Sequence, residues 1–125
     1  MGLFDFGDRA AIRLLAYRIG CTVEDMENEI KKSPNLSTSE LHKLSYFIGE
    51  EMHKLFLLVR SLSQSSQDSL KVEFKGNKLL FWSFVSELVP INNKVRDLTG
   101  YDFLENKVTN KDLFMSLCKK NSIKT

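Results

Sequence analysis

Few side chains in this 125-residue chain could carry out chemistry. It has two histidines, His42 and His53, which lie on one predicted helix. They are about 16 Å apart along the helix axis, so one metal ion cannot bind both. Glu50 and His53 have the i, i+3 spacing of di-iron carboxylate bundles, but the second motif that such a site requires is missing. We therefore expect no metal site and no cofactor.

Catalytic motifs are also scarce. The glycines are scattered, so there is no phosphate-binding loop, and the G-x-S-x-G motif is absent. Glu50 with His53 could serve as an acid–base pair of a small hydrolase or nuclease, which we keep as an alternative. Cys21 and Cys118 are predicted to be reduced, buried thiols, and a disulfide between them is the other possibility. The main prediction is that the protein is not an enzyme and has no catalytic residues.

Charge is unevenly distributed, although the net charge is only +2. The segment Gly20–Glu51 holds seven acidic and three basic residues, and residues 103–125 hold five lysines and two acids. The acids would repel DNA phosphates, so we do not expect nucleic acid to bind at this segment. The basic C-terminal part leaves a nucleic-acid-binding regulator as a second alternative.

One long predicted helix positions both histidines and Glu50. From Ser39 to Leu62, apolar residues recur every three or four positions, and Ser39 is the predicted N-cap. The apolar stripe consists of Leu41, Leu44, Ile48, Met52, Leu55, Val59 and Leu62. A second band, His42, Tyr46, His53 and Leu57, either packs on another helix or is exposed for a partner. We favour packing, which makes this the central helix.

Before this helix we expect a helical hairpin. Asp8 can cap a helix that runs to Ile19 and includes Leu14 on its apolar side, with Gly20 at its C′ position. Thr22 can cap a second helix that ends near Ile30.

After it, residues 61–69 are predicted to form a polar loop or linker. Residues 70–83 are ambiguous. A short β-hairpin with a turn at Gly76-Asn77 is possible, but we favour a helix from Asn77 to Pro90. Pro90 then suits the first turn of another helix, which Gly100 ends. Thr109 is the predicted cap of a last helix carrying Leu113, Phe114, Leu117 and Cys118.

The predicted fold class is therefore mostly α. Residues 1–125 form a compact single-domain bundle of five to six helices around a long central helix, with a possible short β-hairpin near 70–83. No apolar run reaches the roughly 20 residues of a membrane span, and the N-terminus lacks a signal peptide. We expect a cytoplasmic protein that does not bind membranes.

Function is predicted mainly by exclusion. We expect a non-enzymatic protein-binding domain, a monomer within a heteromeric complex. The best interpretation is a small inhibitor, such as an immunity protein that neutralises a toxin. If that toxin is a nuclease, an acidic cluster would speed association. The predicted partner-binding residues are Glu24, Asp25, Glu27, Glu29, Tyr46, His53, Trp82 and Glu87.

Overall fold

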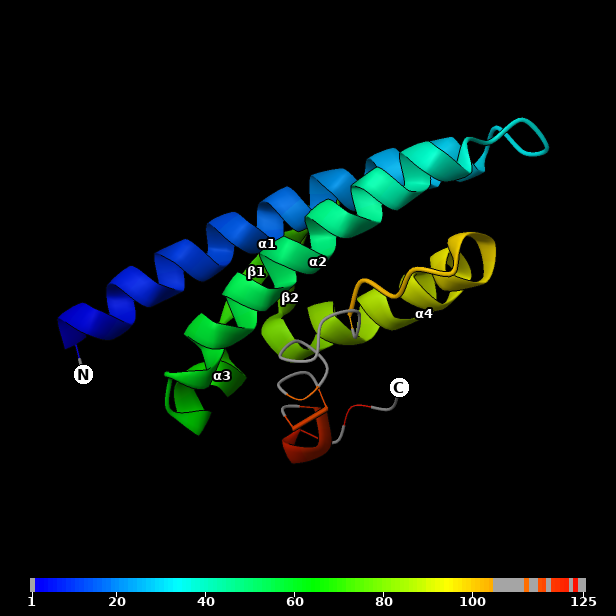
Figure 1. Cartoon of the computed structure of the whole chain (residues 1–125). Helices are drawn as coiled ribbons and strands as arrows, with labels where there is room; N and C mark the ends of the chain where they lie inside the picture. The colour runs from blue at the N-terminus through cyan, green and yellow to red at the C-terminus, as the bar shows by residue number, and fades with distance from the viewer. Residues whose placement is uncertain (1, 105–111, 113–114, 117, 122, 124–125) are drawn as a thin grey trace.

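The structure, a computed structural model, describes residues 2–104, 112, 115–116, 118–121 and 123 (Figure 1). The described residues form a mostly helical single domain, which confirms the predicted fold class. Its elements are α1 (Gly2–Ile30), α2 (Thr38–Arg60), α3 (Gln64–Ser69), β1 (Lys71–Phe74), β2 (Asn77–Leu80) and α4 (Phe81–Thr99). A fifth helix near the C-terminus is described at residues 112, 115–116 and 118–120.

The helices α1 and α2 lie side by side and run antiparallel (Figure 1). Polar contacts join them near both ends and the middle: Ser61 Oγ donates to Asp8 at 3.3 Å, Arg18 pairs with Glu51 at 2.9 Å, and the Ser37 N–H donates to Glu29 at 2.8 Å. Between these contacts, α1 buries residues spaced alternately by four and three positions, as expected for one helix face. These residues are Ile12, Ala16, Ile19, Val23 and Met26.

The predicted break in α1 is wrong, because this helix continues through Gly20 and Thr22. Gly20 is buried against the β-hairpin, and a Cβ atom at this position would lie 3.3 Å from Cδ1 of Phe74. The glycine therefore permits close packing and does not end the helix. Thr22 is not an N-cap, because its hydroxyl donates to the Arg18 carbonyl at 2.9 Å, as is typical within a helix.

The long helix α2 is close to its predicted bounds. Ser37, two residues before the predicted cap Ser39, is the N-cap and accepts the Glu40 N–H at 3.1 Å. The apolar stripe is buried as predicted, with Leu44 partly buried. The second band does not pack as favoured: His42, Tyr46 and Leu57 are exposed and His53 is half-buried.

The polar stretch 61–69 is not a simple loop, because it contains α3. Ser63 caps this helix by accepting the Ser66 N–H at 3.2 Å. Gln67 is 1% exposed, and its amide donates to the Val59 and Leu62 carbonyls at 3.0 and 3.1 Å. These bonds satisfy carbonyl groups at and just beyond the C-terminal end of α2.

Residues 71–80 form the β-hairpin, which the sequence pattern predicts less strongly than a helix. The two turn residues are Lys75 and Gly76, which both have positive φ, and β2 begins at Asn77. The favoured helix from Asn77 is therefore wrong at its start, since α4 begins at Phe81. Pro90 lies within α4 and does not begin a new helix.

Gly100 ends α4 in the left-handed conformation, as predicted. The chain then returns over the core, where Tyr101, Phe103 and Leu104 are buried. Asn92 of α4 holds this return: its side chain accepts the Phe103 N–H and donates to Asp102, both at 2.8 Å.

Part of the predicted last helix can be compared with the structure. Cys118 is buried, as predicted, whereas Thr109, Leu113, Phe114 and Leu117 lie outside the described residues. Cys21 was expected to be buried and is instead exposed; both cysteines are free.

Candidate protein-binding groove

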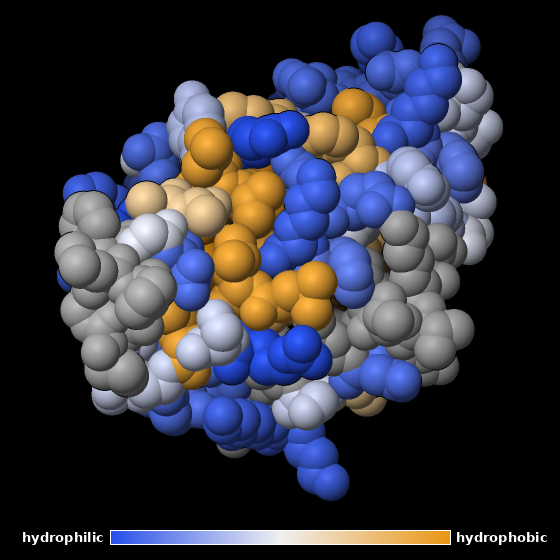
Figure 2. All heavy atoms as spheres, turned by 60° about the vertical axis from the view of Figure 1, so that its left-hand side comes forward, coloured by the Kyte–Doolittle hydropathy of each residue, from blue (hydrophilic) through white to orange (hydrophobic). Residues whose placement is uncertain are grey.

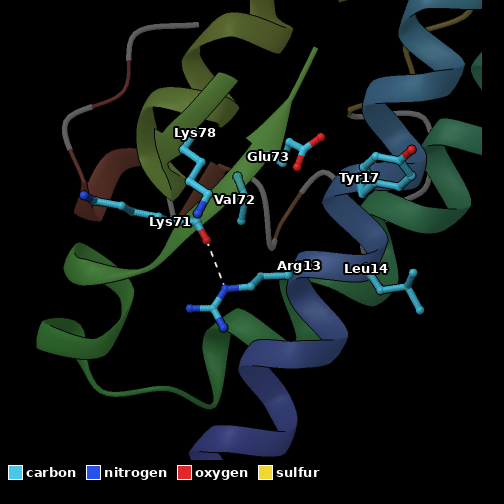
Figure 3. A pocket seen from close by; sticks show the side chains of 7 residues that line it. All are labelled: Arg13, Leu14, Tyr17, Lys71, Val72, Glu73 and Lys78. Carbon is cyan, nitrogen blue, oxygen red and sulfur yellow. Dashed lines mark hydrogen bonds between the residues drawn. The ribbon is translucent and has the colours of Figure 1, made fainter. Parts of the chain in front are cut away.

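A groove of about 640 Å³ lies between α1 and the β-hairpin (Figure 3). It is lined by Arg13, Leu14 and Tyr17 from α1 and by Lys71, Val72, Glu73 and Lys78 from the hairpin. We call it the α1–hairpin groove.

The hairpin side of the groove follows from strand alternation. Val72 and Phe74 point into the core, so Lys71 and Glu73 are exposed. In the antiparallel register Glu73 lies opposite Lys78. Two lysines and one carboxylate therefore face solvent from a surface that the core holds in place.

The helix side follows from the 100° step between successive residues. Arg13 and Tyr17 lie about 100° and 140° around α1 from the buried Ile12, on the flank beside the hairpin. Arg13 Nε donates to the Lys71 carbonyl at 3.2 Å, which joins the two sides of the groove (Figure 3). This hydrogen bond uses only Nε. The Arg13 side chain is exposed, and its two terminal guanidinium nitrogens point away from the Lys71 carbonyl.

Cations outnumber acids in the groove, with three basic side chains and one carboxylate. The carboxylates of Glu73 and Glu24 act most strongly on Tyr17. The pKa of Tyr17 is raised above its ordinary value, first by a hydrogen bond and electrostatic interaction with Cys21 and then by the nearby carboxylates of Glu73 and Glu24. The phenol therefore stays neutral at physiological pH. The groove thus has a basic end at Arg13 and Lys71 and a more acidic end beyond Tyr17.

Large apolar side chains are exposed at the groove. Leu14 is 58% and Tyr17 is 50% exposed. Figure 2 shows that hydrophobic residues also reach the surface on one face of the molecule, as a band between hydrophilic residues. Contiguous exposed apolar patches that are rimmed by polar residues are typical of binding surfaces.

The four predicted acidic residues have different surroundings. Glu24 and Asp25 are exposed, but Glu27 pairs with Lys75 of the hairpin turn at 2.7 Å. Glu29 is 7% exposed and accepts hydrogen bonds from the Ser37 N–H and from Lys32. These bonds, chiefly the one from Ser37, lower the pKa of Glu29 below its ordinary value. Glu27 and Glu29 therefore stabilise the fold, and Glu24 and Asp25 are the pair presented to solvent.

The other predicted residues are distributed over α2 and α4. Tyr46 is 48% exposed, and its ring centroid lies 6.2 Å from that of Tyr101. Trp82 is half-buried and packs edge-on against Phe81 at 4.8 Å, while Glu87 is exposed. His53 is half-buried, as is Glu50, the other residue of the alternative acid–base pair. The structure does not join all eight predicted residues into one site.

Among the described residues, no group of three or more His, Cys, Asp or Glu side chains could hold a metal ion. None of the described helices is both long enough and apolar enough to cross a membrane. No protein-family model, curated protein or solved structure matches this chain.

The sequence analysis does not predict the groove, because it expects a helix end at Gly20 within α1. Leu14 was assigned to the apolar side of a short helix, but it lies about 200° around α1 from Ile12, opposite the core. The regular spacing from Ile12 to Met26 could have indicated one helix with Leu14 and Tyr17 outside its buried face. The basic side also required the hairpin, which we had ranked below a helix.

Proposed function

We propose that this protein is a protein-binding domain and that its partner contacts the α1–hairpin groove. The observation that carries the proposal is the exposure of Leu14 and Tyr17 beside Arg13, Lys71 and Lys78. Tyrosine and arginine are favoured at the centre of protein interfaces, because they bury a large area and also donate hydrogen bonds. The groove is built on a helix and a hairpin that both pack on the core, so little ordering is required before binding.

Within this class we propose an inhibitor that acts by direct binding in the cytoplasm, in the manner of an immunity protein. Support comes from the small single domain and from Glu24 and Asp25, which are exposed on the same helix as the groove. Glu24 is close enough to Tyr17 to contribute to its raised pKa. A partner that covers Tyr17 would therefore also meet an acidic surface, which speeds association when the part of the partner that faces Glu24 and Asp25 is basic.

The test is affinity capture of the tagged protein from the cells that produce it, at low and moderate salt after nuclease treatment. We would compare the wild type with a Leu14→Asp/Tyr17→Asp double variant. Leu98→Asp is the matched control, because Leu98 is 39% exposed on α4 and does not line the groove. We expect one protein to be recovered with the wild type and the control and to be lost with the double variant.

Equal recovery with all three proteins would contradict binding through the groove. Recovery of no protein by the wild type, from cells grown under several conditions, would contradict the protein-binding function itself. Circular dichroism of each variant checks that the helical content is unchanged, so that loss of binding cannot be attributed to unfolding.

A further inference from the structure

We propose that the α1–hairpin groove binds an acidic peptide segment of the partner, whose carboxylates pair with Arg13 and Lys71 while an apolar side chain rests against Tyr17. This inference rests on the proposed function, since it assigns the chemistry of the partner for the same groove.

The basic end of the groove supplies the first argument. Arg13 is held by its Nε bond to the Lys71 carbonyl, and that bond places a guanidinium and the Lys71 backbone together. The terminal nitrogens of an arginine fixed in this way can donate two parallel hydrogen bonds to one carboxylate. Lys71 and Lys78 add two further exposed charges from the hairpin. The groove is therefore complementary to an acidic ligand.

The apolar part of the groove supplies the second argument. Tyr17, Leu14 and the buried Val72 line it together with the basic residues, in a volume of about 640 Å³. This volume is large enough for several side chains of a bound segment. A ligand with charge alone would leave the tyrosine ring and Leu14 in water, whereas a peptide can cover them with an apolar residue.

The acidic end determines how the peptide lies. Glu73 lines the groove, and the negative charges of Glu73 and Glu24 both reach Tyr17. They repel carboxylates from that end, so the acids of the peptide lie toward Arg13 and Lys71. The same two residues disfavour nucleic acid and anionic membranes, whose phosphates would cover the whole surface.

The test is fluorescence anisotropy with short fluorescein-labelled peptides and the full chain. The first peptide has leucine and phenylalanine between aspartates and glutamates. The second has lysines in place of the acids, and the third has alanines in place of the apolar residues. We expect the first to bind at least about tenfold more tightly than either of the others, because charge and an apolar anchor are both required.

Two variants with opposite expected effects make the test specific. Lys71→Glu reverses a charge that lies opposite Leu80 in the hairpin, so the new carboxylate faces no acid directly across the strands, although Glu73 lies two residues along the same exposed face. It should weaken binding of the first peptide by about tenfold. Glu73→Gln removes the one carboxylate among the described residues that line the groove and should tighten binding about two- to threefold, which general destabilisation cannot do. Lys43→Glu, an exposed charge reversal on α2, is the control and should leave affinity unchanged.

Three results would overturn this inference. The lysine peptide could bind as tightly as the acidic peptide, or the Lys71→Glu variant could bind the acidic peptide as tightly as the wild type does. The wild type could also bind an anionic vesicle or a short DNA duplex more tightly than the acidic peptide. These results are separate from a failure of the proposed function. If the Leu14→Asp/Tyr17→Asp variant loses its captured partner while the acidic peptide does not bind, the groove binds a protein but the inferred chemistry of that protein is wrong.

Discussion

Replacing Asn92 by leucine should destabilise the protein by about 2–4 kcal/mol. Asn92 is 3% exposed and joins α4 to the chain that follows it. Its Oδ1 accepts the Phe103 N–H at 2.8 Å and its Nδ2 donates to Asp102 Oδ1 at 2.8 Å. Leucine has a similar size but can make neither bond.

The magnitude follows from the two bonds taken separately. The Phe103 N–H is buried, so leaving it unpaired costs about 1–3 kcal/mol. Losing the bond to Asp102 costs about 1 kcal/mol. This second loss is small because the Asp102 carboxylate keeps its bonds from Arg96 and from the Leu104 N–H. The first loss is therefore the larger.

The assay is urea unfolding monitored by circular dichroism, with the free energy of unfolding obtained by linear extrapolation. Asn93→Leu is the matched control, because Asn93 is the neighbouring residue of α4 and is half-buried. This control should change the free energy of unfolding by less than about 1 kcal/mol. If Asn92→Leu also stays within about 0.5 kcal/mol of the wild type, the two bonds do not hold residues 101–104 and the reasoning is refuted.

Three further predictions follow from other contacts. Glu29→Gln should lower the free energy of unfolding at neutral pH and make it depend less on pH in the acid range. The pKa of Glu29 is lower in the folded protein than the ordinary value of 4.5, so its carboxylate stabilises the fold above pH 4.5, and this contribution is lost as the pH falls through the folded pKa. Gly20→Leu should lower the free energy of unfolding by about 1–3 kcal/mol, because its side chain must displace the ring of Phe74. A thiol reagent should modify Cys21 rapidly in the folded protein and Cys118 only after unfolding, since the first is exposed and the second is buried.

Each of these predictions has an internal comparison. Glu24→Gln, on the same helix, should change the free energy of unfolding at neutral pH by no more than about 0.5 kcal/mol, since Glu24 is exposed. Gly7→Leu should be tolerated, because no atom lies within 4 Å of a Cβ at Gly7. Equal changes in stability in the two glycine variants would show that the contact with the hairpin does not set the effect, because helix propensity favours leucine over glycine at both positions. Simultaneous reaction of both thiols in the folded protein would contradict the burial of Cys118.

Periodicity was sufficient to predict the helices that pack with one regular face. The stripe of α2 from Leu41 to Val59 is buried as its spacing indicates, because its apolar residues recur at helical spacing on one face. Gly100 was also predictable, since a left-handed residue after a helix favours glycine. These features depend on residues that are near one another in the sequence.

The wrong predictions concern residues whose surroundings are set by a segment that is distant in the sequence. In the sequence Gly20 is typical of a helix end, but in the structure it lies within α1 and packs against Phe74. Glu29 is typical of an exposed surface acid, but in the structure it accepts a hydrogen bond from the Ser37 N–H. The α1–hairpin groove could not be predicted for the same reason, because Tyr17 and Lys71 belong to segments that meet only in the fold. Local patterns contain no information on such contacts.

The contact between Gly20 and Phe74 also bears on how the chain folds during synthesis. At roughly 5–20 residues per second, Phe74 leaves the ribosome about 2–9 s after the end of α1. In this interval α1 and α2 can pair, but the surface around Gly20 that the hairpin will cover is still open to water. An uncovered apolar surface on the nascent helical pair favours aggregation and chaperone binding during this interval. Translation past the hairpin is what closes this surface.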